Sequence, residues 1–337
     1  MSVIVVIGSG AMGSAMSFPA RANGHTVRLV GTILDREIIN HAKETGYHLT
    51  LQRSLPAGIE YFQLDELDKA LAGVDLIIGG VSSFGVNWFV DEIIPKLPET
   101  VPVLSVTKGM INNPDGSFIS YPKFYSNKYP VRDFCAIGGP CTSYELADLD
   151  NTHVCFCGKS MQSLLVMKAM LETSYYHISL SEDIEGLECA VALKNAYALA
   201  VSLAVGLALK DGDILHYNSQ AAIFGQSVRE MRKLLKLFGF EDDNIIYGTG
   251  DLYVTVFGGR TRKIGTLLGK GYNFESAMNE LSGITLESIV IATRTGEAVR
   301  ALVNAGKAQE QDFPLLFHVF DIITNDVKVD IPWKAFG

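Results

Sequence analysis

This chain of 337 residues contains little cysteine. Its five cysteines are an odd number and do not follow the pattern of a small secreted domain, so a disulfide framework is disfavoured. Cys155 and Cys157 would share one face of a strand, but no second pair and no histidine stands at metal-ligand spacing from them. We therefore expect no metal site and expect most cysteines to be small, buried, apolar side chains.

Positive charge is also scarce. The chain has 28 lysines and arginines against 37 aspartates and glutamates, which gives a net charge of −9 and no reason to expect nucleic-acid binding. The N-terminal apolar run has no basic segment before it and is not a signal peptide, and the longest apolar segment, residues 196–209, is too short to span a bilayer. The absence of targeting signals favours the cytoplasm.

Hydrophobic residues are abundant, at 48% of the chain, and the length suits two domains. Apolar runs alternate with amphipathic stretches over the first half, which predicts a parallel sheet covered on both faces. After about residue 184 the sequence predicts helices only. We expect an α/β Rossmann-type, doubly wound domain over residues 1–184 and an all-α substrate-binding domain over residues 185–337. The predicted strands are residues 3–7, 27–30, 76–81, 101–106, 134–137 and 152–157.

A glycine-rich turn follows the first predicted strand. Gly8, Gly10 and Gly13 have the GxGxxG spacing and lead into a helix-compatible stretch at residues 11–22. The first glycine allows the turn, the second lets the backbone approach a pyrophosphate, and the third lets the helix pack on the strand. The N–H groups that open the helix attract the phosphates. We therefore expect a dinucleotide at residues Gly8, Ser9, Gly10, Ala11, Met12 and Gly13.

Lys194 lies in a stretch that is apolar on nearly every side and should form a buried helix. Burial disfavours the charged form of a lysine and lowers its pKa, so that it can take a proton from an alcohol and return it. The alternative is a lysine that reaches the surface or pairs with a carboxylate such as Glu188. Composition alone does not separate these two interpretations.

Three further features favour a ligand-binding role. Lys108 follows the carboxyl end of a predicted strand, where parallel sheets place ligands. Residues 258–263 read Gly-Gly-Arg-Thr-Arg-Lys, a flexible basic loop in which Arg260 could clamp a phosphate, unless the segment is a solvated charge run at a turn. Asp251 and Thr255 are one helical turn apart and could face the same cavity, although Asp251 could equally begin a helix.

These segments together resemble the soluble NAD(P)-dependent glycerol-3-phosphate dehydrogenases over nearly the whole chain. No single motif is decisive, but six in the right order are specific. They are residues 8–13 (Gly-Ser-Gly-Ala-Met-Gly), 106–109 (Val-Thr-Lys-Gly), 139–145 (Gly-Pro-Cys-Thr-Ser-Tyr-Glu), 193–195 (Leu-Lys-Asn), 250–255 (Gly-Asp-Leu-Tyr-Val-Thr) and 258–262 (Gly-Gly-Arg-Thr-Arg).

The resemblance implies a Rossmann domain and a helical domain like that of 6-phosphogluconate dehydrogenase. It also implies reversible reduction of dihydroxyacetone phosphate to glycerol 3-phosphate, a precursor of phospholipids. Lys194 matches the proton acceptor of the family, helped by Lys108 and Asp251. Lys108 matches a residue that touches substrate and cofactor, and Arg260 the phosphate clamp. The other implied substrate residues are Gly139, Cys141, Thr255, Gly259 and Thr261, and the other implied cofactor residues are Ser143, Arg260 and Glu287.

Three positions depart from the family pattern. Thr261 stands where asparagine is usual, Ser143 where alanine is usual, and Cys141 where a small polar residue is common. Threonine keeps one donor but loses the reach of the amide, which leaves the preferred polyol phosphate open. The choice of cofactor is open too. No acidic residue follows the second strand until Asp35, and Arg36 could approach a 2′-phosphate, which favours NADP or the use of both cofactors over NAD alone.

Two other functions stay open at this point. One is a related dehydrogenase of a larger polyol phosphate or a 3-hydroxy acid, and the other is a nucleotide sensor without turnover. The joint presence of Lys108, Lys194, Asp251 and Arg260 argues against the sensor, which needs no buried base. The sequence leaves open whether the chain forms a homodimer.

Overall fold

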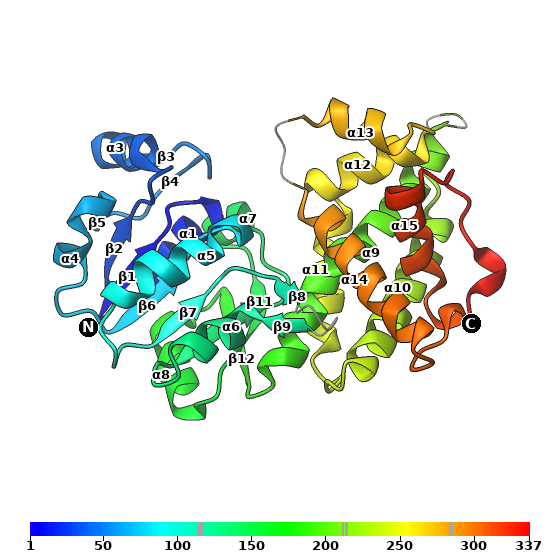
Figure 1. Ribbon diagram of the computed structural model, residues 1–337. Coiled ribbons are helices and arrows are strands. Elements are labelled where there is room, and N and C mark those ends of the chain that lie inside the picture. Colours follow the sequence, from blue (N-terminus) through cyan, green and yellow to red (C-terminus); the bar gives the residue numbers. More distant parts are fainter. Residues whose placement is uncertain (113–117, 211, 213–214, 283–285) are drawn as a thin grey trace. The chain divides into compact units, whose positions relative to one another are not determined.

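The computed structural model describes residues 1–112, 118–210, 212, 215–282 and 286–337 (Figure 1). The chain divides into two compact units. Unit 1 contains residues 1–109 and 120–188, and unit 2 contains residues 110–119 and 189–337. The division falls four residues beyond the expected boundary, and it groups a short strand pair from the first half of the chain with the helical unit.

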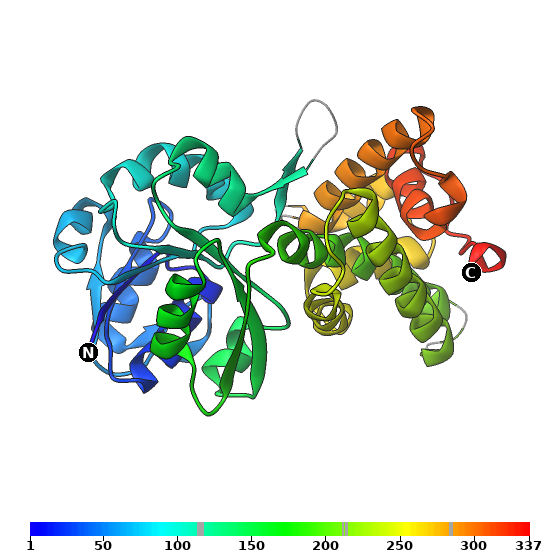
Figure 2. The ribbon, with the colours of Figure 1, turned by 90° about the horizontal axis from the view of Figure 1, so that it is seen from below.

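Unit 1 is built on an eight-stranded sheet whose order is β12-β11-β10-β7-β6-β1-β2-β5. At its centre Ile4 pairs with Val27 on one side and with Leu76 on the other. These apolar strands are buried because helices cover both faces of the sheet (Figures 1 and 2). The strands are β1 (Val3–Ile7), β2 (Thr26–Val30), β5 (Ile59–Phe62), β6 (Leu76–Gly79), β7 (Val103–Ser105), β10 (Phe134–Gly138), β11 (Thr152–Cys157) and β12 (Tyr176–Ser181).

The sheet differs from the predicted one in two respects. All six predicted strands are present, but β5 and β12 at the two edges were not predicted. The sheet is also not wholly parallel, since β10 and β11 pair antiparallel, with Ala136 opposite Cys157. An apolar run shows that a strand is buried and does not show its direction, so the sequence pattern could not reveal this reversal. Two smaller strand pairs are β3 (Tyr47–His48) with β4 (Arg53–Ser54), and β8 (Met110–Asn112) with β9 (Phe118–Ser120).

The first helical stretch of unit 1 is interrupted at Met16, where α1 ends and α2 begins. Pro19 lacks the N–H that would continue the hydrogen bonding through this point. The helices of unit 1 are α1 (Ala11–Ala15), α2 (Ser17–Ala22), α3 (Arg36–Thr45), α4 (Leu67–Ala70), α5 (Val86–Trp88), α6 (Tyr121–Lys128), α7 (Ser143–Ala147) and α8 (Met161–Leu171).

Unit 2 is organised around α9 (Ile184–Lys210), which begins in unit 1 and supplies much of the hydrophobic core of unit 2. Its length and composition would suffice to cross a membrane, but 83% of its most apolar window is buried in the protein, as in the core helix of a globular domain. The other helices are α10 (Tyr217–Leu237), α11 (Ile245–Val256), α12 (Gly259–Gly269), α13 (Phe274–Glu280), α14 (Glu287–Asn304) and α15 (Pro314–Asn325) (Figure 1).

Glycines bring α11 and α12 unusually close to α9. A Cβ at Gly248 of α11 would lie 2.7 Å from the carbonyl oxygen of Ala190. On α12, a Cβ at Gly265 would lie 2.4 Å from Cβ of Ser202, and one at Gly269 would lie 2.2 Å from the oxygen of Leu203. Since real Cβ atoms do not approach so closely, these glycines set the distance between α9 and the two helices that carry the predicted substrate residues.

The cysteines largely behave as expected. Within the part of the chain that the structure describes, none of the five forms a disulfide bond, and Cys135, Cys155, Cys157 and Cys189 are buried. Burial raises the pKa of the Cys157 thiol well above its usual value, so this thiol is inert. Within the described residues, no three His, Cys, Asp or Glu side chains are grouped to hold a metal ion.

Candidate active site

The glycine-rich turn of unit 1 is closely packed at two of its three glycines and open at the third. Gly8 has a φ of +106°, and a Cβ there would lie 2.7 Å from the carbonyl carbon of Gly80. A Cβ at Gly13 would lie 2.3 Å from the oxygen of Gly8, so this glycine lets α1 pack on the turn. By contrast, a Cβ at Gly10 would meet no protein atom closer than 3.9 Å. The fold itself does not require glycine there, whereas close approach of a ligand to the backbone would.

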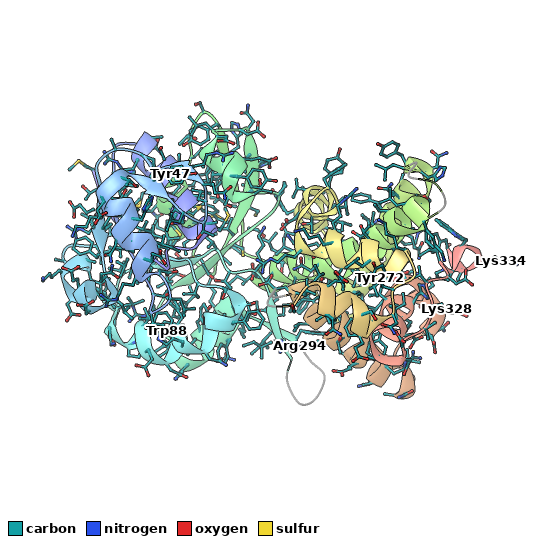
Figure 3. All side chains as sticks on the ribbon, turned by 90° about the horizontal axis from the view of Figure 1, so that it is seen from above. Tyr47, Trp88, Tyr272, Arg294, Lys328 and Lys334 are labelled. Carbon is teal, nitrogen blue, oxygen red and sulfur yellow. The ribbon has the colours of Figure 1, made fainter. Side chains whose placement is uncertain are left out.

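A pocket of about 340 Å³ adjoins this turn. Three of its wall residues are large apolar side chains that are mostly exposed, namely Ile33 (70%), Leu34 (86%) and Phe84 (65%). Exposed apolar side chains beside a glycine-rich backbone suit a flat, partly apolar group next to phosphates. Trp88, which is labelled in Figure 3, belongs to the same wall. The complete wall consists of Gly8, Gly10, Thr32, Ile33, Leu34, Asp35, Gly80, Val81, Ser82, Phe84, Gly85 and Trp88.

Asp35 is nearer to the glycine-rich turn than the sequence suggested. Its Oδ2 accepts hydrogen bonds from the backbone N–H of Ser9 (3.1 Å) and of Thr32 (2.8 Å), and from the hydroxyl of Thr32 (2.8 Å). An acidic group therefore does stand at the end of β2, after a turn of four residues. Asp35 is the first acidic residue after the strand, as the sequence indicated, and its hydrogen bond to Ser9 shows that its carboxylate reaches the glycine-rich turn. Arg36 is exposed and lies 3.6 Å from Asp65.

A second group of predicted residues meets at the carboxyl ends of β7 and β10. The ammonium group of Lys108 donates a hydrogen bond to the carbonyl oxygen of Gly139 (2.8 Å). Lys108 also shares a cavity of about 20 Å³ with Met12 and Cys141, two residues predicted for cofactor and substrate. Ser143 opens α7 just beyond them. The structure thus brings together the Lys-Gly motif, the Gly-Pro motif and the start of α1.

Glu188 is a buried carboxyl group near Lys108 that the sequence did not single out as functional. It is completely buried, and neither of its oxygens has a hydrogen-bond partner among the described residues. Burial raises the pKa of Glu188 well above its usual value and the charge of Glu185 adds to this, while the ammonium of Lys108 opposes it. Glu188 is therefore not the partner of Lys194 that the sequence allowed.

In unit 2, Lys194 meets the two residues that were predicted to accompany it. Its ammonium group lies 2.6 Å from Oδ1 of Asp251 and 3.1 Å from the hydroxyl of Thr255, which in turn donates to the carbonyl oxygen of Asp251 (2.7 Å). The side chains of Lys194 and Asp251 are only 13% and 2% exposed. Asp251 lies within α11 rather than at its start, so its alternative role at a helix N-terminus is not realised. The close approach at Gly248 explains why α11 can present both residues to α9.

The basic glycine segment is the beginning of a helix rather than the flexible loop that we predicted. Gly259 has a φ of +78° and opens α12, so Arg260 lies in the first helical turn and is exposed, while Thr261 is buried at 8% exposure. The amide of Gly258 precedes a helix start, where N–H groups attract anions. Arg262 is committed elsewhere, since its guanidinium donates to the carbonyl oxygen of Val256. The remaining predicted residue, Glu287, opens α14.

Two models of one protein family match the chain, one over its N-terminal part and one over its C-terminal part. The N-terminal model of NAD-dependent glycerol-3-phosphate dehydrogenase matches residues 3–164, and the C-terminal model of the same family matches residues 183–333. The chain belongs to the NAD-dependent glycerol-3-phosphate dehydrogenase family. The resemblance found in the sequence motifs is thereby confirmed, as is the expectation of an NAD(P)-dependent dehydrogenase.

Individual relatives agree with this result. The chain is 32% identical over 332 residues to the NADP(+)-dependent glycerol-3-phosphate dehydrogenase of Archaeoglobus fulgidus, covering 97% of each chain. It is 25% identical to a glycerol-3-phosphate dehydrogenase [NAD(P)+] of Bacillus cereus, covering 98% of this chain and 93% of the relative.

Solved structures show the same fold. The glycerol-3-phosphate dehydrogenase of Plasmodium falciparum superimposes with a TM-score of 0.84 at 20% identity, over 100% of this chain and 95% of the other. The enzyme of Coxiella burnetii superimposes with a TM-score of 0.79 at 22% identity, over 99% and 97%. The predicted Rossmann-type domain followed by a helical domain is thus confirmed.

Proposed function

We propose that this dehydrogenase catalyses the reversible reduction of dihydroxyacetone phosphate to sn-glycerol 3-phosphate. The observation that supports this most directly is the cluster of Lys194, Asp251 and Thr255, a nearly buried ammonium group fixed by a carboxylate and a hydroxyl. When bound, the reduced nicotinamide supplies the hydride. The residues of the chain then have to bind the phosphate, orient the ketone and exchange one proton with its oxygen.

Lys194 is the residue best suited to that proton exchange. Its Nζ is held by Asp251 and Thr255, so its position is fixed before substrate binds. An ammonium group at the ketone oxygen stabilises the negative charge that develops there and delivers the proton that the alcohol product needs. In the reverse direction the neutral amine takes the proton from the alcohol. Asp251 favours the protonated lysine and so supports the reduction.

Arg260 is our candidate for the phosphate clamp. It is exposed in the first turn of α12, where a guanidinium fork and the N–H groups of the helix start both suit a phosphate. In unit 1 the ammonium group of Lys108 is held by its hydrogen bond to the carbonyl oxygen of Gly139, and we assign Lys108 to substrate and cofactor on its position in the family motif. We assign Gly139, Cys141, Thr255, Gly259 and Thr261 to the substrate and Ser143 and Glu287 to the cofactor, on their positions in the family motifs.

The glycine-rich turn fits the pyrophosphate of the cofactor, because Gly10 leaves open the space into which a side chain would project. We propose that both cofactors are used and that NADPH is somewhat favoured. The relative from Archaeoglobus fulgidus is named as NADP(+)-dependent, which supports NADPH. The carboxylate of Asp35 would repel a 2′-phosphate and so favour NADH, but its Oδ2 already receives three hydrogen bonds inside the turn. We further propose that the enzyme acts in the cytoplasm and supplies glycerol 3-phosphate for phospholipid synthesis.

The test is oxidation of NADPH and of NADH, followed by absorbance, with a panel of ketones. We expect turnover of dihydroxyacetone phosphate, weak turnover of dihydroxyacetone and none of 2-oxo or 3-oxo acids. Preference for a larger ketose phosphate would replace our substrate but keep the reaction. Cofactor binding without turnover on any ketone would contradict the proposal and favour the nucleotide sensor.

A further inference from the structure

A histidine lies beneath the glycine-rich turn of unit 1, in a segment that no motif covers. His48 ends the short strand β3 and is completely buried. Its Nε2 lies 2.9 Å from the carbonyl oxygen of Ser9 and 2.9 Å from the hydroxyl of Ser14 on α1. Ser9 is itself buried and stands between Gly8 and Gly10. The imidazole therefore contacts the turn from the side of the protein interior.

The hydrogen bonds of His48 determine which nitrogen carries its proton. Nδ1 lies 2.9 Å from the backbone N–H of Leu51, which can only donate, so Nδ1 is the acceptor. The proton of the neutral ring is then on Nε2, and it is donated to the carbonyl oxygen of Ser9, which can only accept. A second proton on Nδ1 would oppose the N–H of Leu51. Burial lowers the pKa of His48, against the nearby charge of Asp35, and so favours this neutral tautomer.

Asp35 holds the same residue from its other end. The backbone N–H of Ser9 donates to Oδ2 of Asp35 at 3.1 Å, across 26 residues of chain. The N–H of Ser9 belongs to the peptide plane that it shares with Gly8, and its C=O belongs to the plane that it shares with Gly10. His48 and Asp35 thus fix two consecutive peptide planes of the turn, each through one hydrogen bond.

We propose that His48 and Asp35 are positioning residues of the cofactor site, which hold the Gly8-Ser9-Gly10 turn so that the N–H of Gly10 is presented to the pyrophosphate. In a trans peptide the C=O and the following N–H point in opposite directions. The bond from His48 to the oxygen of Ser9 therefore directs the N–H of Gly10 away from the interior. Gly10 lines the pocket described above, and glycine would otherwise leave this plane free to rotate.

This inference rests on the proposed function, because it takes the turn to be the pyrophosphate site. In the usual account of such turns, the glycines and the helix start are sufficient to orient the backbone N–H groups toward the pyrophosphate. Here two side chains from different elements, β3 and the turn after β2, are needed as well. An unsatisfied buried carbonyl would remain if His48 were lost, and the turn would lose its fixed orientation.

The experiment compares His48→Phe, which fills the space without the hydrogen bonds, with His48→Gln, which can still donate and accept. We measure the Kd of NADPH by fluorescence, the KM for each substrate, kcat, and the melting temperature. For His48→Phe we expect the Kd and KM of NADPH to rise about tenfold, with little change in kcat or in the KM of dihydroxyacetone phosphate. His48→Gln should recover most of this loss. His177→Phe, at an exposed histidine of β12 that bonds to Asn151, is the matched control.

Asp35→Ala tests the other end of the turn without disturbing the core, since Asp35 is only partly buried. It should weaken the binding of NADH, which carries no 2′-phosphate for the carboxylate of Asp35 to repel, and leave the KM of dihydroxyacetone phosphate unchanged, even if His48→Phe fails to fold. The inference is overturned if the wild type binds both cofactors, His48→Phe binds NADPH within twofold of the wild type, and Asp35→Ala binds NADH within twofold of the wild type. It is also overturned if the losses fall equally on both substrates. A wild type that binds neither cofactor would instead contradict the proposed function.

Discussion

The two units make their candidate binding groups from different parts of the amino acid. In unit 1 the groups that would contact the cofactor are mainly backbone N–H groups of the glycine-rich turn, which a ligand can approach because Gly10 carries no side chain. In unit 2 the groups are side chains on helices, namely Lys194, Asp251 and Arg260. Every residue has a peptide group, so the site in unit 1 depends on the absence of a side chain that would block the ligand. The site in unit 2 depends on which side chains two helices bring together.

The largest effect should come from removing the central side chain of unit 2. Lys194→Ala should lower kcat by about 10²–10⁴-fold, the usual worth of general acid–base catalysis, with the Kd of NADPH nearly unchanged. The change also leaves Asp251 buried without its ion pair, so the melting temperature must be measured in parallel. Lys307→Ala, at an exposed lysine, is the control. A fall in kcat of less than about tenfold, with chemistry shown to be rate-limiting, would mean that Lys194 does not exchange the proton.

The next effect should come from the phosphate clamp. Arg260→Ala removes a charge-assisted contact worth about 1.5–3 kcal/mol, so kcat/KM for dihydroxyacetone phosphate should fall at least about tenfold. The value for unphosphorylated dihydroxyacetone should hardly change. Lys263→Ala removes an exposed positive charge from the same helix and controls for the general electrostatic field. Equal losses on the two ketones would show that Arg260 does not read the phosphate.

Paired alanine substitutions test whether the turn of unit 1 needs glycine for binding or for folding. Gly10 has a φ of −67° and room for a Cβ, so Gly10→Ala should leave stability within about 1 kcal/mol and weaken cofactor binding about tenfold. Gly13→Ala forces a contact of 2.3 Å with the oxygen of Gly8 and should destabilise the protein by about 1–3 kcal/mol. Gly225→Ala, where no atom lies within 4 Å, is the control. Unaltered NADPH binding by Gly10→Ala would show that the turn is not part of the cofactor site.

This difference between the units also explains what could be predicted from the sequence. A backbone site leaves its pattern in adjacent residues, so the turn at Gly8–Gly13 and the strand before it were both predicted. The contact between Lys194 and Asp251 joins residues 57 positions apart, and only the resemblance to a family suggested it. His48 was missed because nothing in its neighbourhood marks a histidine that reaches back 39 residues to Ser9.

Other differences follow from signals that local patterns do not contain. The edge strand β5 reads Ile-Glu-Tyr-Phe, too short and too polar to stand out, and the direction of β11 is set by the fold rather than by its own residues. The start of α12 was taken for a loop because Gly258 and Gly259 usually break helices, whereas here they precede and open one. The packing glycines Gly248 and Gly265 had no visible role until the helices were placed.

A buried carboxyl in unit 2, that of Glu230, should make the stability of the protein depend on pH. Glu230 receives hydrogen bonds from the N–H groups of Leu315 and Leu316, from Gln226 and from Tyr197, yet burial raises its pKa to about 7. The folded protein therefore holds a proton that the unfolded chain releases near pH 4.5, and the free energy of unfolding should fall as pH rises from about 4.5 to 7.

The loss over this range is of the order of 3 kcal/mol, and Glu230→Gln should flatten it. Thermal unfolding between pH 4.5 and 8 is the measurement. Glu275→Gln, at an exposed glutamate of α13, is the control. An unchanged slope in Glu230→Gln would show that another group carries the pH dependence. Unit 1 offers the contrasting case of Glu188, whose carboxyl is buried without hydrogen-bond partners among the described residues.

The smallest effect concerns the departure from the family at Thr261. This side chain is buried at 8% exposure in the first turn of α12, next to the proposed clamp at Arg260. If threonine simply replaces asparagine as a second phosphate donor, Thr261→Asn should hold or raise kcat/KM for dihydroxyacetone phosphate, by less than about tenfold. If the site instead accepts a bulkier polyol phosphate, the amide should crowd that substrate and shift selectivity toward the three-carbon ketone.

Of these two results for Thr261→Asn we expect the first, because the other residues of the substrate motifs are in place. Thr266→Asn, five residues further along α12, controls for a change in helix packing. A wild type inactive on dihydroxyacetone phosphate, together with a Thr261→Asn variant that gains this activity, would overturn the substrate assignment while leaving the roles of Lys194 and Arg260 intact.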